Sequence, residues 1–173
     1  MNHPIIMTAA MAPPDQIWAD RLRAAHFPPD RNFLKAHITL FHHLPPSQSG
    51  AVRAAVKAMT VQYAPPRADV TRLLNLGRGV AYFIESPDLL GIRAEMAERF
   101  HGLLTPQDQA RPRLHITIQN KVEPAVARAL LSELESNFEP RPLSITGLAL
   151  HHYLGGPWEP AGTWSFRGQT AAA

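Results

Sequence analysis

Apolar and polar residues alternate in two short stretches that share the pattern His-Ile-Thr-aliphatic, His37 to Leu40 and His115 to Ile118. Alternation with a period of two is typical of a half-buried β-strand, in which successive side chains point to opposite faces. The histidine and threonine of each stretch therefore share one face, while the isoleucine between them faces a core. The alternation predicts strands over residues 32–41 and 113–119.

The rest of the chain predicts an alternation of helices and strands around these two stretches. Apolar residues at helical spacing predict helices over 15–26, 49–60, 87 to about 104, and 124–138, and Pro87 and Pro124 suit a first helical turn. Further strands are expected over 5–10, 68–76, 80–85, 143–154 and 163–167, with Gly77-Arg78-Gly79 as a hairpin turn. The polar segment 105–112 is expected to be a loop.

The order of these elements repeats. Each half runs strand, helix, His-Ile-Thr strand, helix, strand, and His37 and His115 are 78 positions apart. A nearly constant offset indicates an internal duplication. We therefore predict an α+β fold with two mostly antiparallel sheets, flanked by helices around a central cleft. The expected organisation is a single domain over 1–173 with two pseudo-symmetric lobes, divided near 77–87, that can exchange terminal strands.

Composition narrows the function classes. The 173 residues are 45% hydrophobic and 18% charged, as in ordinary globular proteins, and the net charge of +3 tolerates an anionic ligand without requiring one. The chain has no cysteine, which excludes thiol nucleophiles, disulfides and cysteine-bound zinc, and we expect a cytoplasmic location. No stretch approaches the roughly 20 apolar residues of a membrane span, so we expect no membrane partner. We also expect the protein to be a monomer.

The two lobes of a duplicated unit usually pack about a pseudo-twofold axis, which would bring both His-Thr pairs to one cleft. Two imidazoles there suit in-line displacement at phosphorus, because one can take a proton from the attacking oxygen while the other protonates the leaving oxygen. Thr39 and Thr117 would then bind the non-bridging oxygens of the phosphate. No metal and no cofactor are expected, because no carboxylate cluster accompanies the histidines.

Five other residues are candidate substrate contacts. Lys35 and Arg113 each lie two positions before a motif histidine, and the same strand faces continue to Phe41 and Gln119. Tyr153 could stack on a nucleobase or pack against the protein, and Phe41 and Trp158 share this ambiguity.

The two H-x-[ST]-hydrophobic motifs in a duplicated chain of this length resemble the two-histidine (2H) phosphoesterase superfamily, and among its members the bacterial 2′-5′ RNA ligase-like proteins, which include RNA 2′,3′-cyclic phosphodiesterases. The resemblance runs from the first strand to Arg167. It implies that His37 and His115 are the acid and the base and that Thr39 and Thr117 hold the phosphate. It also implies metal-independent hydrolysis of a 2′,3′-cyclic phosphate of RNA ends or of a small cyclic nucleotide to a 2′-phosphate, and reversible 2′-5′ ligation.

Two alternatives remain. The same scaffold could be a non-catalytic RNA- or nucleotide-binding module. A metal-dependent hydrolase could instead use the pairs His42-His43 and His151-His152. Adjacent residues on a strand point to opposite faces, so neither pair chelates a metal easily, and we interpret all four as loop or strand-end histidines.

Overall fold

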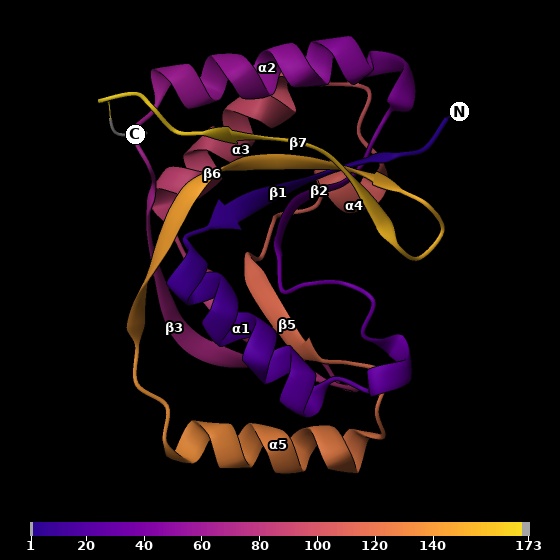
Figure 1. The fold of residues 1–173 in the computed structure, drawn as a ribbon, viewed down its shortest axis with the longest axis vertical. Helices are drawn as coiled ribbons and strands as arrows, with labels where there is room; N and C mark the ends of the chain where they lie inside the picture. Colours follow the sequence, from indigo (N-terminus) through magenta and orange to yellow (C-terminus); the bar gives the residue numbers. More distant parts are fainter. Residues whose placement is uncertain (1, 171–173) are drawn as a thin grey trace.

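A computed structural model gives the fold for residues 2–170 and confirms the α+β class (Figure 1). The long elements largely match the predicted ones, and two short 3₁₀ turns (Pro29–Arg31 and Pro46–Gln48) and a four-residue helix are additional. The elements in chain order are β1 (Ile5–Met11), α1 (Pro13–His26), β2 (Ile38–Leu44), α2 (Ser49–Gln62), β3 (Arg67–Asn75), β4 (Val80–Glu85), α3 (Pro87–Arg99), α4 (Pro106–Gln109), β5 (His115–Gln119), α5 (Pro124–Ser136), β6 (Arg141–Tyr153) and β7 (Trp158–Ser165).

The strands form one antiparallel system in the order β2-β1-β6-β3-β4-β5, with β7 added to β6. Strand β6 connects its two parts, because Arg141 to Ser144 pair with β3 and Ile145 to His152 pair with β1. The last two strands of the chain thus complete the part of the sheet that holds β1 and β2. The division into two pseudo-symmetric lobes near 77–87 stays a prediction.

Helix α1 packs on the motif strand of the other half of the sequence, whereas α3 packs on β3 and reaches the other motif strand through one side chain. Helix α1 connects β1 to β2 but lies against β5, and its Trp18 ring contacts Tyr82 of β4 at 5.1 Å between centroids. Helix α3 connects β4 towards β5, but Arg93 on it donates to the carbonyl of Leu40 in β2 at 3.1 Å. In Figure 1, α1 and α5 accordingly flank the β3–β5 part of the sheet, and α2 and α3 lie at the opposite end of the molecule.

Local sequence explains where the helices begin and end. Proline occupies the first turn of α1, α3 and α5, where the missing N–H would have no helical partner. Ser86 caps α3 by accepting a hydrogen bond from the Leu89 amide at 3.1 Å. Helix α3 ends at Arg99, five residues earlier than predicted, and the chain then turns through Gly102 at φ +83°. The segment predicted as a loop contains α4, which Thr105 caps.

The predicted hairpin turn between β3 and β4 is confirmed, and it depends on two glycines. Asn75 pairs with Val80, and Gly77 adopts φ +85°, a conformation that other residues rarely adopt. A Cβ atom on Gly79 would collide with the backbone of Gln119. The hairpin therefore approaches the end of β5 as closely as a backbone can.

Candidate active site

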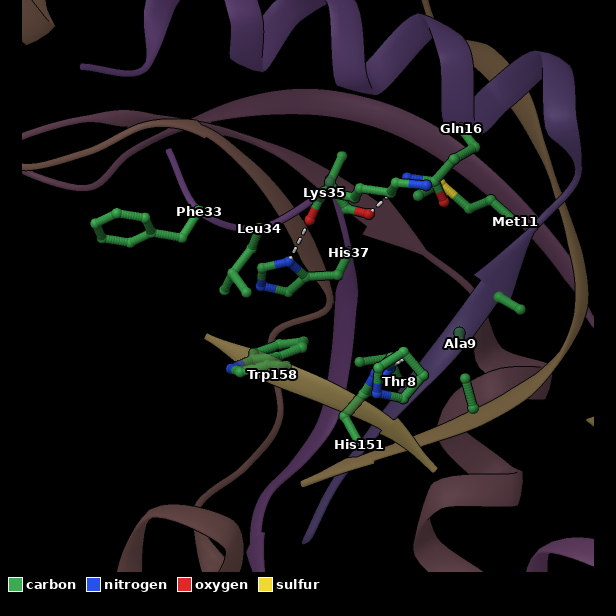
Figure 2. Close-up of a pocket in the computed structure, with 14 residues that line it drawn as sticks. Thr8, Ala9, Met11, Gln16, Phe33, Leu34, Lys35, His37, His151 and Trp158 are labelled. Carbon is green, nitrogen blue, oxygen red and sulfur yellow. Dashed lines mark hydrogen bonds between the residues drawn. The ribbon is translucent and has the colours of Figure 1, made fainter. Parts of the chain in front are cut away.

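The imidazoles of the two motif histidines are held by the same backbone contact. Nδ1 of His37 lies 2.8 Å from the carbonyl oxygen of Lys35, and Nδ1 of His115 lies 2.5 Å from that of Arg113 (Figure 2 shows the first). A carbonyl only accepts, so Nδ1–H must donate in both rings. The hydrogen bond therefore leaves Nε2 of each ring for proton exchange, as donor or acceptor according to the charge of the ring.

The two motif histidines are close enough for the charge of His115 to influence His37. Strand β2 lies against β5 although neither pairs with the other in the sheet. Burial lowers the pKa of His37 to about 4; the Lys35 carbonyl opposes this shift, and the charges of Arg23, His151 and His115 add to it. His37 is therefore neutral at pH 7, with the Nε2 lone pair free to accept a proton.

A cavity of about 360 Å³ opens beside His37, a volume in the range of small-molecule sites (Figure 2). It lies over β1 and the segment before β2, and Trp158 of β7 covers one side. Its lining combines small apolar positions with a few polar groups and two aromatic rings: Thr8, Ala9, Ala10, Met11, Gln16, Phe33, Leu34, Lys35, Ala36, His37, Ala149, His151, Trp158 and Pro160.

A third histidine, His151, lines the same cavity as His37. The indole of Trp158 contacts both the His37 ring and the His151 ring, with centroid distances of 4.5 and 5.1 Å. Nε2 of His151 lies 3.0 Å from the hydroxyl of Thr8. Thr8 sits directly opposite Thr39 in the β1–β2 pair, so the two hydroxyl side chains share a face.

Sequence reasoning missed both Thr8 and His151. No local signal marks Thr8, since its importance comes from pairing with β2 and β6. The sequence predicts a loop or strand-end position for His151, but β6 continues past it to Tyr153. Only the pairing of β1, β6 and β7 brings these side chains to His37.

Thr39 and Thr117 are both half-buried beside their histidines, and buried arginines support the two motif strands. Arg23 of α1 donates to the Thr117 carbonyl at 3.0 Å, and Arg93 of α3 donates to the Leu40 carbonyl at 3.1 Å. Each arginine thus reaches the motif strand of the other half of the sequence. These bonds satisfy buried carbonyl groups that would be costly to leave unpaired.

The expected placement of Phe41 and Gln119 on the histidine faces is wrong. A bulge follows the threonine in both strands: Thr39 pairs with Thr8 but Phe41 with Met7, and Thr117 pairs with Ala81 but Gln119 with Val80. The extra residue reverses the alternation, and Phe41 and Gln119 are only 0% and 4% exposed. Phe41 packs under the Arg93 guanidinium at 4.4 Å. The bulges thus turn both side chains away from the histidine faces.

The other candidates have mixed positions. Lys35 lines the cavity, and Arg113 is exposed beside His115 without an ion pair among residues 2–170. Tyr153 is 41% exposed and pairs with Trp158 at the end of β6, outside the cavity lining.

His42 and His43 are held in place by hydrogen bonds to one carboxylate. Asp108 of α4 accepts hydrogen bonds from both of their backbone amides at 2.8 Å and from the His42 imidazole at 3.2 Å. Asp108 thus fixes the end of β2. Residues 2–170 contain no group of three or more His, Asp or Glu side chains arranged to hold a metal ion. No helix within this range has the length and apolar character needed to cross a membrane.

The antiparallel α+β fold matches the LigT-like folds of two-histidine phosphoesterases. The chain belongs to the 2′-5′ RNA ligase superfamily, whose family model matches residues 12–157.

Solved structures show the same fold. TT0787 of Thermus thermophilus has a TM-score of 0.70 at 15% identity, covering 98% of this chain and 100% of that one. Escherichia coli LigT complexed with 3′-AMP has a TM-score of 0.62 at 14% identity, covering 96% and 99%. A structure described as a phosphoesterase has a TM-score of 0.59 at 14% identity, covering 98% and 100%. No curated protein matched the chain in a sequence comparison.

Proposed function

We propose that this chain is a metal-independent phosphodiesterase that hydrolyses 2′,3′-cyclic phosphate ends of RNA, or related cyclic nucleotides, to 2′-phosphates. The proposal rests on one observation: His37 and His115 have the same hydrogen-bonding arrangement, in which Nδ1–H donates to the carbonyl of the residue two positions earlier. Both Nε2 atoms are then available for proton transfer at one phosphate.

In this proposal His37 is the general base and His115 the general acid. Neutral His37 accepts a proton from water at Nε2 while the water oxygen bonds to phosphorus. The bond from phosphorus to the ribose 3′-oxygen breaks, and His115 gives the Nε2 proton to that oxygen. The 2′-oxygen keeps the phosphate. The two rings end with exchanged protonation states, and a proton returned through solvent restores them.

Hydroxyl groups would stabilise the charge that builds on the non-bridging oxygens. Thr39 and Thr117 supply one each. Thr8 adds a third, because it lies opposite Thr39 and contacts Nε2 of His151. If His151 donates to the Thr8 oxygen, the Thr8 hydroxyl hydrogen is left for the phosphate.

The cavity beside His37 would hold the nucleoside. Trp158 and Phe33 give it aromatic surface, and Phe33 is 68% exposed, unusually open for a phenylalanine. Lys35 adds a cation at the same cavity. LigT, which has the same fold, was crystallised with 3′-AMP and with phosphate, so that protein holds a nucleoside monophosphate and a free phosphate.

Ligation would use the same site: if a 5′-hydroxyl end attacks the cyclic phosphate in place of water and the 3′-oxygen leaves, a 2′-5′ linkage forms, and the reverse step cleaves it. The experiment that tests the proposal is product identification. Purified protein in excess EDTA is incubated with adenosine 2′,3′-cyclic phosphate, and the phosphomonoester is assigned by ³¹P NMR. Adenosine 2′-phosphate is the expected product; a 3′-phosphate, or no reaction, would refute the proposal.

A further inference from the structure

A cation lies on the sheet face that carries His115, which is not among the residues lining the cavity beside His37. Phe83 of β4 pairs directly with His115 of β5, and Arg72 of β3 pairs directly with Phe83. Residues directly opposite in antiparallel strands share a face, so Arg72, Phe83 and His115 form one row across three strands. The Arg72 guanidinium lies over the Phe83 ring, 4.2 Å from its centroid.

The surroundings of His37 and His115 therefore differ. On the His37 side the lining includes Ala10 and Ala149, and these small residues leave room for the cavity. On the His115 side an aromatic ring and a guanidinium occupy the row next to the histidine. If both halves of a duplicated chain bound equivalent parts of a ligand, the surroundings of the two histidines would be expected to match. Their difference indicates that each binds a different part.

Arg72 is available to a ligand. Its side chain is exposed and makes no hydrogen bond or ion pair with any residue from 2 to 170. Phe83 is half-buried, and its face holds the guanidinium by a cation–π contact. A planar guanidinium fixed in this way presents edge N–H groups suited to a phosphate.

The neighbouring row limits how far an anion can extend. Asp69 and Glu85 face each other directly across β3 and β4, and both are exposed. These carboxylates would repel a phosphate placed beyond Arg72. The row thus favours one phosphate next to Arg72 and disfavours a second further along the strands.

The stereochemistry of ribose connects the two sides. When the 2′,3′ edge of the ring holds the reacting phosphate, the base on C1′ and the 5′-carbon on C4′ lie at opposite ends of that edge. A nucleoside with its base in the cavity beside His37 therefore directs its 5′-oxygen towards the side of His115. Arg72 lies on that side.

We propose that Arg72, positioned by Phe83, binds the 5′-phosphate or 5′-phosphodiester of the nucleotide whose 2′,3′-cyclic phosphate is opened. This inference rests on the proposed function and narrows its substrate class. The enzyme should prefer substrates that continue at the 5′ side, as an RNA end does, over a cyclic mononucleotide with a free 5′-hydroxyl. A single phosphate on the 5′-oxygen should account for the whole of this substrate preference.

The test compares kcat/KM for three substrates: adenosine 2′,3′-cyclic phosphate, the same nucleotide with a 5′-phosphate, and the dinucleotide ApA ending in a 2′,3′-cyclic phosphate. We expect the second and third to exceed the first by roughly tenfold or more, the range of a charge-assisted hydrogen bond. The Arg72→Gln variant should lose this advantage and keep its activity on the first substrate. Phe83→Leu should lose part of it, and Arg72→Lys should retain part of it.

The matched control is Arg128→Gln, an exposed arginine on α5, which packs on the other face of this part of the sheet. It should leave all three values unchanged, and thermal unfolding checks that each variant is folded. Equal wild-type values for the three substrates would overturn this inference alone, as would a preference that Arg72→Gln preserves or that only Arg113→Gln removes. Absence of turnover on all three would overturn the proposed function and this inference with it.

Discussion

The indole of Trp158 packs against the imidazole of His37, with ring centroids 4.5 Å apart and planes inclined by 54°. Burial is the main cause of the lowered pKa of His37, and Trp158 supplies part of that burial from β7. The final hairpin of the chain thus completes the environment of a histidine that lies more than a hundred residues earlier.

Trp158→Ala should return the pKa of His37 from about 4 towards its ordinary value of 6.5 by letting water reach the ring. The acidic limb of the kcat/KM profile should then move to higher pH, because His37 must be neutral to act as the base. A pH–rate profile measures the limb. Trp158→Phe keeps an aromatic cover and should move it less; an unchanged limb in Trp158→Ala would contradict the assignment.

Folding stability should depend on pH through the same residue. Between about pH 4 and 6.5 the unfolded chain binds a proton at His37 and the folded protein does not, so stability rises with pH across this window and is lost as pH falls. Urea unfolding of wild type and His37→Gln at pH 4.5 and 7.5 measures the difference. The variant should lose less stability on acidification; a parallel loss in both proteins would show that His37 is not protected from protonation.

Thr8→Val replaces a buried hydroxyl, 4% exposed, with a methyl group of similar size and removes the partner of His151. We expect kcat to fall roughly fivefold to tenfold, the cost of one hydrogen bond made in the transition state, while KM changes little. Steady-state kinetics separates the two constants, and the melting temperature shows whether the variant is intact. A rise in KM with normal kcat would instead make Thr8 a contact of the bound substrate.

Asp108→Asn should destabilise the fold by about 2 kcal/mol, because an amide cannot accept from both the His42 and His43 backbone amides while also receiving the His42 imidazole. Tm should drop by roughly 5 °C. Asp30→Asn, an exposed aspartate in the turn before β2, is the control and should change Tm little.

The same carboxylate predicts a loss of stability in acid. Burial raises the pKa of Asp108, but hydrogen bonds from the His42 side chain and from the His42 and His43 amides outweigh it, and the net pKa is lowered from 3.8. This stabilisation is present above pH 3.8 and is lost as pH falls through the lower folded value. A wild-type advantage over Asp108→Asn that does not shrink as the pH falls below 3.8 would contradict this account.

The sequence predicted the order of elements and the two motif histidines because both depend on local patterns. Alternation around His37 and His115 placed each beside its threonine, and the repeat predicted that they meet. Helical spacing and Pro87 or Pro124 located the helices within a few residues.

What the sequence did not reveal depends on non-local pairing. The bulges that turn Phe41 and Gln119 inward are set by the register of β1 and β4. The positions of Thr8 and His151 require β6 to connect both parts of the sheet. The alternation within a single strand does not reveal its register with a neighbour. The predicted strand faces therefore hold as far as Thr39 and Thr117 and fail at the bulges that follow.

The most direct measurement of the central claim is turnover of adenosine 2′,3′-cyclic phosphate in excess EDTA by wild type, His37→Ala, His115→Ala and His101→Ala. His101 is an exposed histidine after α3 and serves as the matched control. Wild type and His101→Ala should be equally active, and His37→Ala and His115→Ala should each lose about a hundredfold or more in kcat, the contribution expected of a general acid or base. Full activity in either motif variant, or loss of wild-type activity in EDTA, would contradict the account.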